Sequence, residues 1–212
     1  MNDLSPVQGI DFAFYYIVGI SCFFLFLITV LMIYFVFKYR RNKNPVSSDI
    51  RGHTGLELVW TVIPTIIALT MFYVGWHSYI KLRNVPPGAI EVDVTAMTYS
   101  WEFRYEKGGP VSRELLVVPK GKPIKLNLIS TDTLHGFFVP AYRIKIDVLP
   151  NRTTYAWFYP DTLGEFDIQC TVYCGLGHSG MVAKIRVVDD KEYHEYIEQL
   201  YKAEEDEEQE DE

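Results

Sequence analysis

The sequence predicts a two-helix membrane hairpin followed by an all-β domain, from two long apolar stretches, a change of hydrophobic period near residue 90 and a series of short strand patterns. Residues 12–37 contain no ionised side chain, and residues 58–80 contain His77 as the one group that ionises near neutral pH. Each stretch exceeds the roughly 20 residues with which an α-helix crosses a bilayer. Residues 1–84 are therefore predicted to form a transmembrane hairpin.

The loop at residues 38–57 predicts the orientation of this hairpin. It carries the basic residues Lys38, Arg40, Arg41, Lys43 and Arg51. Basic loops stay on the cytoplasmic side, so both termini and the β domain are expected on the outer, periplasmic side of a bacterial plasma membrane. A cleaved signal peptide fits poorly, because residues 1–11 hold no Lys or Arg and the apolar stretch is too long.

After a Pro-rich linker ending at Gly88, residues 90–96 alternate apolar and polar side chains, which is typical of a half-buried strand. Further strands are expected at residues 101–105, 114–118, 124–130, 153–159, 164–170 and 181–188. A helix over residues 189–203 follows. Many short strands without intervening helices favour a Greek-key sandwich or barrel over residues 85–203.

The net charge of −7 is concentrated at the C-terminus. Eight of the nine residues 204–212 are acidic, which leaves 20 basic and 19 acidic side chains in residues 1–203. The tail composition predicts an acidic, disordered segment. The balanced remainder offers no concentrated basic face, which argues against a nucleic-acid partner.

A group of soft metal ligands falls within one predicted loop. Cys170, Cys174, His178 and Met181 lie within 12 residues, and His135 lies upstream. Such donors suit copper or zinc. A disulfide on the oxidising side of a membrane, a Cys₂His₂ zinc site and a mononuclear blue-copper site are alternatives. Zinc leaves Met181 unused, blue copper leaves one thiolate unused, and two copper ions with bridging thiolates use every donor.

The Cys-x₃-Cys-x₃-His-x₂-Met loop, the upstream Asp-x-x-His, the helical hairpin and the Leu-Val-Trp-Thr-Val-Ile-Pro stretch at residues 58–64 together resemble subunit II of the haem-copper oxidases, over residues 10–190. The resemblance implies a cupredoxin domain with a binuclear copper centre, CuA. This centre would accept electrons from cytochrome c and pass them to haem in subunit I, the large subunit of a complex that reduces oxygen and translocates protons.

The resemblance also implies roles for individual residues. Cys170 and Cys174 would bridge the copper ions, His135 and His178 would each bind one of them, and Met181 would be a weak ligand. The family usually has Glu at the position of Val172, where the backbone carbonyl binds copper and the carboxylate helps to bind magnesium. Valine keeps the carbonyl alone, so we expect no magnesium ligand from this subunit.

Three further positions have implied roles in electron and proton transfer. Aligned on Ser100 and Glu102, the family's electron-accepting Trp falls on Met97, and Tyr99 or Trp101 are candidate substitutes. Glu57, three residues before Trp60, matches a Glu at the cytoplasmic mouth of a proton-uptake path; an exposed loop carboxylate is the alternative.

Asp132 resembles a carboxylate that attracts the lysines of cytochrome c, although a solvated surface side chain would look the same in the sequence. Two other functions also fit the motif. One is the electron-accepting subunit of a CuA-type nitric oxide reductase, and the other is a membrane-tethered copper carrier or storage protein.

Overall fold

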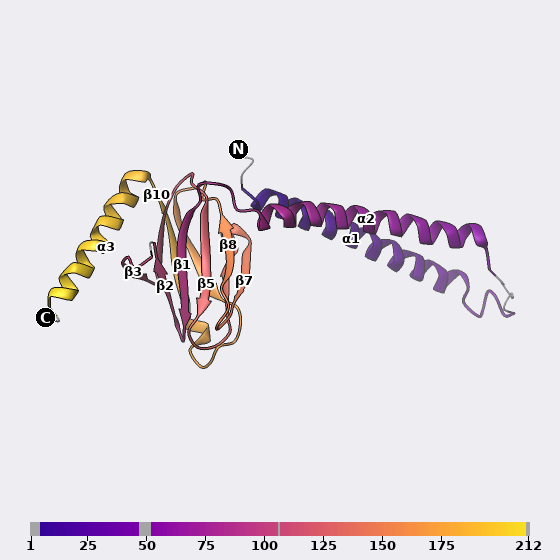
Figure 1. Ribbon diagram of the computed structural model, residues 1–212. Coiled ribbons are helices and arrows are strands. Elements are labelled where there is room, and N and C mark those ends of the chain that lie inside the picture. The colour runs from indigo at the N-terminus through magenta and orange to yellow at the C-terminus, as the bar shows by residue number, and fades with distance from the viewer. Residues whose placement is uncertain (1–4, 47–51, 106, 211–212) are drawn as a thin grey trace. The chain divides into compact units, whose positions relative to one another are not determined.

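The computed structural model describes residues 5–46, 52–105 and 107–210 (Figure 1). The chain divides into two compact units. One comprises Gln8–Tyr79, and the other comprises Ile80–Glu212 together with Met1–Val7.

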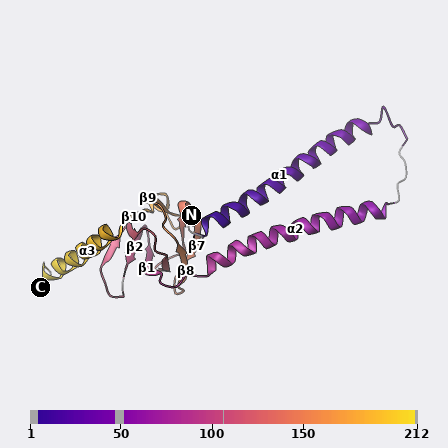
Figure 2. The ribbon, with the colours of Figure 1, turned by 90° about the horizontal axis from the view of Figure 1, so that it is seen from above.

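The first unit is a pair of long helices, α1 (Val7–Lys38) and α2 (Thr54–Arg83). Both are long and apolar enough to cross a membrane, as predicted, and each extends beyond the predicted span at both ends. They are joined near the start of α1 by a hydrogen bond of 2.9 Å from Ser78 Oγ to the Gly9 carbonyl, and they separate toward the connecting loop (Figure 2). Arg51 of that loop lies outside the described residues.

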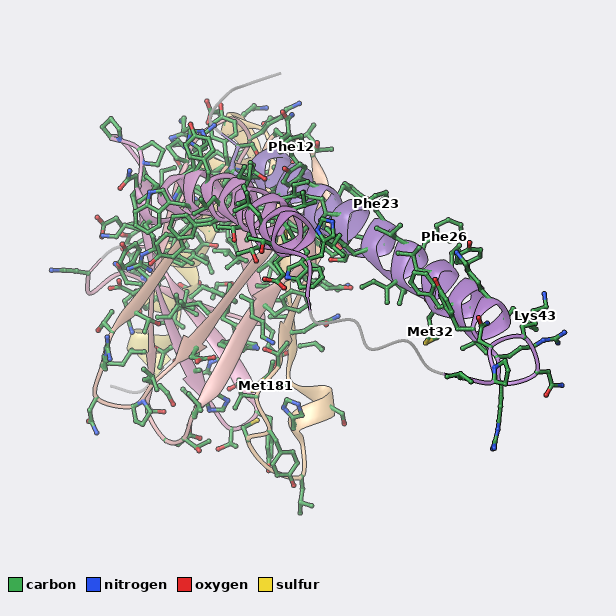
Figure 3. All side chains as sticks on the ribbon, turned by 90° about the vertical axis from the view of Figure 1, so that its right-hand side faces the viewer. Phe12, Phe23, Phe26, Met32, Lys43 and Met181 are labelled. Atoms are coloured by element: carbon green, nitrogen blue, oxygen red, sulfur yellow. The ribbon has the colours of Figure 1, made fainter. Side chains whose placement is uncertain are left out.

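The outer surfaces of these helices are apolar. Phe12, Phe23 and Phe26 of α1 project outward (Figure 3), with exposed fractions of 62%, 59% and 71%. Large exposed apolar surfaces mark contact with lipid or with another protein. The backbone hydrogen bonds of a helix are satisfied internally, which allows such a surface to lie in hydrocarbon.

The second unit contains two five-stranded sheets, ordered β3-β2-β1-β5-β8 and β4-β10-β9-β6-β7. The strands of the first sheet are β1 (Ile90–Met97), β2 (Ser100–Arg104), β3 (Val111–Arg113), β5 (Ile124–Ser130) and β8 (Thr154–Phe158). Those of the second are β4 (Leu115–Pro119), β6 (His135–Val139), β7 (Ile144–Val148), β9 (Gly164–Cys170) and β10 (Val182–Val188). Short 3₁₀ turns lie at η1 (Pro140–Tyr142) and η2 (His178–Gly180).

Apolar side chains from both sheets form one core. Val92 and Val94 of β1 are fully buried, as are Ile168 of β9 and Ile185 of β10. The alternation that predicted β1 therefore has its physical cause in burial, since every second side chain faces the core.

Seven strands agree with the sequence prediction to within one residue at each end, but β3, β6 and β7 were missed. β3 has only three residues. β6 is buried at four of its five positions, so it lacks the alternation of a half-buried strand. β7, with the sequence Ile-Lys-Ile-Asp-Val, does alternate and could have been predicted.

The C-terminal helix α3 (Asp190–Glu210) is longer than predicted. The Asp189 carboxylate accepts a hydrogen bond of 2.9 Å from the Glu192 N–H and caps its start. The prediction of a disordered tail from residue 204 is wrong for residues 204–210, which continue the helix. Glu and Gln are good helix formers, so an acidic composition does not by itself end a helix that begins on a packed face.

Candidate metal centre

The predicted ligands meet at one end of the second sheet. Cys170 is the last residue of β9, His135 is the first of β6, and Phe137 lies opposite Cys170 in the register of these two strands. The loop from β9 to β10 brings the other donors back to the same end, where Met181 lies beside η2 (Figure 3). Strand pairing thus joins residues 35 positions apart.

Each of the two cysteine sulfurs has an imidazole nitrogen as a neighbour. Cys170 Sγ lies 3.9 Å from Cys174 Sγ and 3.9 Å from His135 Nδ1. Cys174 Sγ lies 3.6 Å from His178 Nδ1 and 3.8 Å from Met181 Sδ. Ligand atoms of His135, Cys170 and Cys174 all lie within 4.8 Å of one another, a spacing that could hold a metal ion.

A backbone carbonyl completes the group of donors. The Val172 oxygen lies 3.3 Å from Cys170 Sγ. The loop approaches β6 closely because residue 136 is glycine, where a Cβ atom would lie 2.5 Å from Thr171 Oγ1.

The two thiols fit a cation rather than a disulfide. Their separation of 3.9 Å is about twice the length of an S–S bond, and both cysteines are free. Burial raises the pKa of Cys174 to about 11, and the neighbouring Cys170 contributes a smaller part of this rise. A strongly bound cation is therefore needed to hold the sulfur of Cys174 as a thiolate near neutral pH. Two thiolates, two imidazoles and a thioether form the soft donor set that copper favours.

Asp132 fixes the orientation of His135. The fully buried His135 ring donates from Nε2 to Asp132 Oδ1 at 2.8 Å, which leaves Nδ1 facing Cys170 as an acceptor. Asp132 also accepts hydrogen bonds from the N–H of Thr133 at 2.6 Å and from the N–H and hydroxyl of Thr98. Burial alone would raise the pKa of Asp132, but hydrogen bonds from Thr98, His135 and Thr133 outweigh it and hold the pKa well below its usual value.

The structure separates the three candidates for electron acceptance. Trp101 is fully buried, with its ring centroid 6.1 Å from that of His135, so it cannot touch a docked protein. Met97 is half-buried at the end of β1. Tyr99 is 38% exposed, and its side chain packs against the loop between Cys174 and His178. A Cβ atom at Gly175 would lie 2.5 Å from the Tyr99 hydroxyl oxygen, and one at Gly177 would lie 2.5 Å from the ring.

Glu57 lies in the other unit, in the first turn of α2. Its carboxylate accepts a hydrogen bond of 3.4 Å from the His53 N–H, and His53 Nδ1 accepts one of 3.1 Å from the Leu56 N–H. These reciprocal contacts resemble a capping box and stabilise the start of the helix.

Sequence reasoning missed the close packing of Tyr99 on the ligand loop and the hydrogen bond from His135 to Asp132. Gly175 has a φ of 139°, a backbone conformation that favours glycine. The Gly-Leu-Gly segment at residues 175–177 is the sequence feature that could have indicated this tight loop. The contact between Asp132 and His135 has one indication in the sequence, namely their spacing of three residues.

An apolar helical hairpin joined to a two-sheet sandwich, with paired cysteines and histidines at one end, is the architecture of a membrane-anchored cupredoxin subunit. The family models described as the transmembrane domain and the periplasmic domain of cytochrome c oxidase subunit II match residues 4–78 and 110–188. The chain belongs to the subunit II family of the haem-copper oxidases and is a membrane protein.

Named relatives agree with this assignment. Haem-copper oxidase subunit 2 of Aeropyrum pernix is 30% identical, over 79% of this chain and 79% of the relative. Cytochrome c oxidase subunit 2 of Synechocystis is 25% identical, over 91% of this chain and 73% of the relative. A crystal structure of the periplasmic domain of subunit II from Bradyrhizobium japonicum matches with a TM-score of 0.54 and 30% identity, over 57% of this chain and 99% of that one. The chain is thus a component of an oxidase complex that includes a large subunit.

Proposed function

We propose that this chain accepts single electrons from cytochrome c at a binuclear copper centre and passes them to haem in the large subunit of an oxygen-reducing, proton-translocating oxidase. The observation that carries the proposal is the symmetric pairing of two thiols with two imidazoles, since Cys170 faces His135 and Cys174 faces His178. Membership of the oxidase family favours this function over a nitric oxide reductase subunit or a copper carrier.

Six groups would hold the copper ions. They are the sulfurs of Cys170 and Cys174, which would bridge, the imidazoles of His135 and His178, the thioether of Met181 and the carbonyl of Val172. When bound, copper supplies a one-electron redox couple. The protein supplies a fixed set of ligands, in which burial of His135 and Met181 excludes water.

We place the copper domain on the outer side of the membrane and the loop at residues 38–57 on the cytoplasmic side. The four basic residues at positions 38–43 support this orientation. We propose no magnesium ligand from this chain, because the Val172 side chain offers no carboxylate.

The function is tested by rapid mixing of the purified oxidase complex with reduced cytochrome c. The visible absorption of the copper centre should change before that of the haems, because the electron passes through this subunit first. Haem reduction that precedes any change at the copper centre would contradict the proposal.

We expect Tyr99, rather than Trp101, to make the contact through which the electron arrives. Replacing Tyr99 by Ala should lower the rate of copper reduction by cytochrome c about tenfold, because the exposed ring packs directly on the ligand loop. Stopped-flow absorbance measures this rate, and copper content serves as the control. Trp101→Phe, at a buried position, should change the rate less than Tyr99→Ala; the reverse order would assign the contact to Trp101.

We expect Glu57 to act in proton uptake at the cytoplasmic side. Replacing Glu57 by Gln keeps a hydrogen-bond acceptor for the His53 N–H but removes the ionisable group. Turnover coupled to proton uptake should slow several-fold, while copper reduction by cytochrome c stays normal. Steady-state oxygen consumption and stopped-flow copper reduction, measured on the same preparation, separate the two. Unchanged turnover would contradict a role of Glu57 in proton uptake.

A further inference from the structure

Four basic side chains lie close together where α1 ends and the connecting loop begins. They are Lys38, Arg40, Arg41 and Lys43, and we call them the basic turn. All four are exposed, and Lys43 lies at the loop end of α1 in Figure 3. Residues 12–46 contain no Asp or Glu, so nothing in this segment offsets the four positive charges.

Hydrogen bonds fold the basic turn against the end of the helix. The N–H groups of Lys43 and Asn44 both donate to the Arg40 carbonyl, at 2.9 and 3.1 Å. The Asn44 side-chain amide donates to the Lys38 carbonyl at 2.8 Å, and this carbonyl is one of those that a helix leaves unpaired at its C-terminus. The positive charges are therefore presented together on a folded turn.

The length of α1 places the basic turn at the membrane surface. The apolar stretch at residues 12–37 is about 39 Å long as a helix, and the hydrocarbon of a bilayer is about 30 Å thick. Lys38 Nζ lies over the rings of Tyr34 and Tyr39, 5.2 and 5.3 Å from their centroids. Tyrosine is typical of the headgroup layer, so the basic turn lies at the depth of the lipid phosphates.

The basic turn has no carboxylate partner among the described residues. The ion pairs between residues that the structure describes all lie in the second unit, that of the two sheets and α3. Glu57, at the start of α2, accepts a hydrogen bond from the His53 N–H instead. Unpaired guanidinium groups are available to phosphate, which arginine can bind through two parallel hydrogen bonds.

We infer that the basic turn binds the phosphate groups of anionic phospholipids and enriches these lipids around the loop end of the hairpin. A cluster of basic residues directly beside a membrane-spanning helix is attracted to an anionic lipid surface. An acidic segment of another subunit would also match the charge, but the adjoining tyrosines and the depth of the turn favour lipid. Such lipid binding needs a hairpin that spans the membrane, and it is independent of the copper centre and of the electron donor.

The test places a fluorescent dye beside the basic turn in the full oxidase complex, on Asn42→Cys in a Cys22→Ser background. The complex is reconstituted in phosphatidylcholine vesicles, and phosphatidylglycerol or phosphatidylcholine with the same spin label near the headgroup serves as quencher. Phosphatidylglycerol should quench about threefold more strongly at low salt, and the difference should shrink at about 1 M salt. Replacing Arg40, Arg41 and Lys43 together by Gln should make the two lipids quench equally. Dye-treated complex with Cys22→Ser alone gives the background from other cysteines.

The matched control replaces Arg113, Lys184 and Arg186 together by Gln. These residues of the β domain pair with carboxylates, so the control removes the same amount of positive charge outside the hairpin. Surface ion pairs contribute little to stability, and the control should keep both the fold and the wild-type preference for phosphatidylglycerol.

Equal quenching by the two lipids with the wild-type turn would overturn this inference. A preference for phosphatidylglycerol that survives the three substitutions in the basic turn, or one that is lost in the control, would overturn it as well. Quenching by neither lipid would show that another subunit covers the turn, which would assign the positive charges to a protein contact and contradict the lipid site.

Discussion

Replacing Cys170 by Ser should abolish the copper centre and lower the oxidation of cytochrome c by more than about 100-fold. In the proposed centre Cys170 would serve both copper ions, so its loss should have a larger effect than the 10–100-fold that is typical when a hydrogen-bond partner of a ligand is lost. A serine hydroxyl is also a harder donor that copper binds less well. Metal analysis and the visible spectrum of the purified complex measure the loss.

Cys22 provides the matched control for this change. It is the remaining cysteine of the chain and lies in α1, within the other compact unit. Cys22→Ser should retain the copper content, the spectrum and the rate of the wild type. A Cys170→Ser complex that kept a wild-type copper spectrum would contradict the ligand assignment.

Replacing Asp132 by Ala should weaken copper binding about 10–100-fold without removing any ligand. The carboxylate accepts a hydrogen bond of 2.8 Å from the N–H at His135 Nε2 and so keeps Nδ1 free to bind metal. Without this acceptor, the buried ring can rotate or change its tautomer, and its N–H is left unpaired. Competition with a copper chelator measures the affinity.

Asp132→Asn separates this positioning role from a role in donor docking. The amide oxygen can still accept the hydrogen bond from His135, although the negative charge is lost. Most of the copper affinity should therefore return in Asp132→Asn, and the salt dependence of cytochrome oxidation should stay that of the wild type. Normal copper affinity in Asp132→Ala would contradict the positioning role, and a changed salt dependence in Asp132→Asn would assign Asp132 to docking.

Patterns within short stretches of sequence predicted the helices, strands and ligand loop that depend on residues close together in the chain. The two apolar stretches predicted α1 and α2 because the bilayer imposes a minimum length on a spanning helix. Alternation predicted β1 because every second side chain is buried. The spacing of Cys170, Cys174, His178 and Met181 placed four donors in one loop before any fold was known.

Features that depend on the pairing of distant strands could not be predicted in this way. His135 reaches the cysteines because β6 pairs with β9, yet β6 gave no alternating pattern. Trp101 is a candidate for electron acceptance in the sequence, but the packing of the two sheets buries it beside His135 and Phe137. The Asp132 carboxylate accepts a hydrogen bond from His135 Nε2 while its side chain stays 32% exposed, and the spacing of three residues alone does not reveal this contact.

The electron paramagnetic resonance spectrum of the oxidised, purified complex, recorded together with its copper content, tests the central claim most directly. The account predicts an unpaired electron shared equally by two copper nuclei, with a hyperfine pattern that Cys174→Ser abolishes and Cys22→Ser leaves unchanged. A pattern from a single copper nucleus in this subunit, or a centre occupied by zinc and silent in this spectrum, would contradict it.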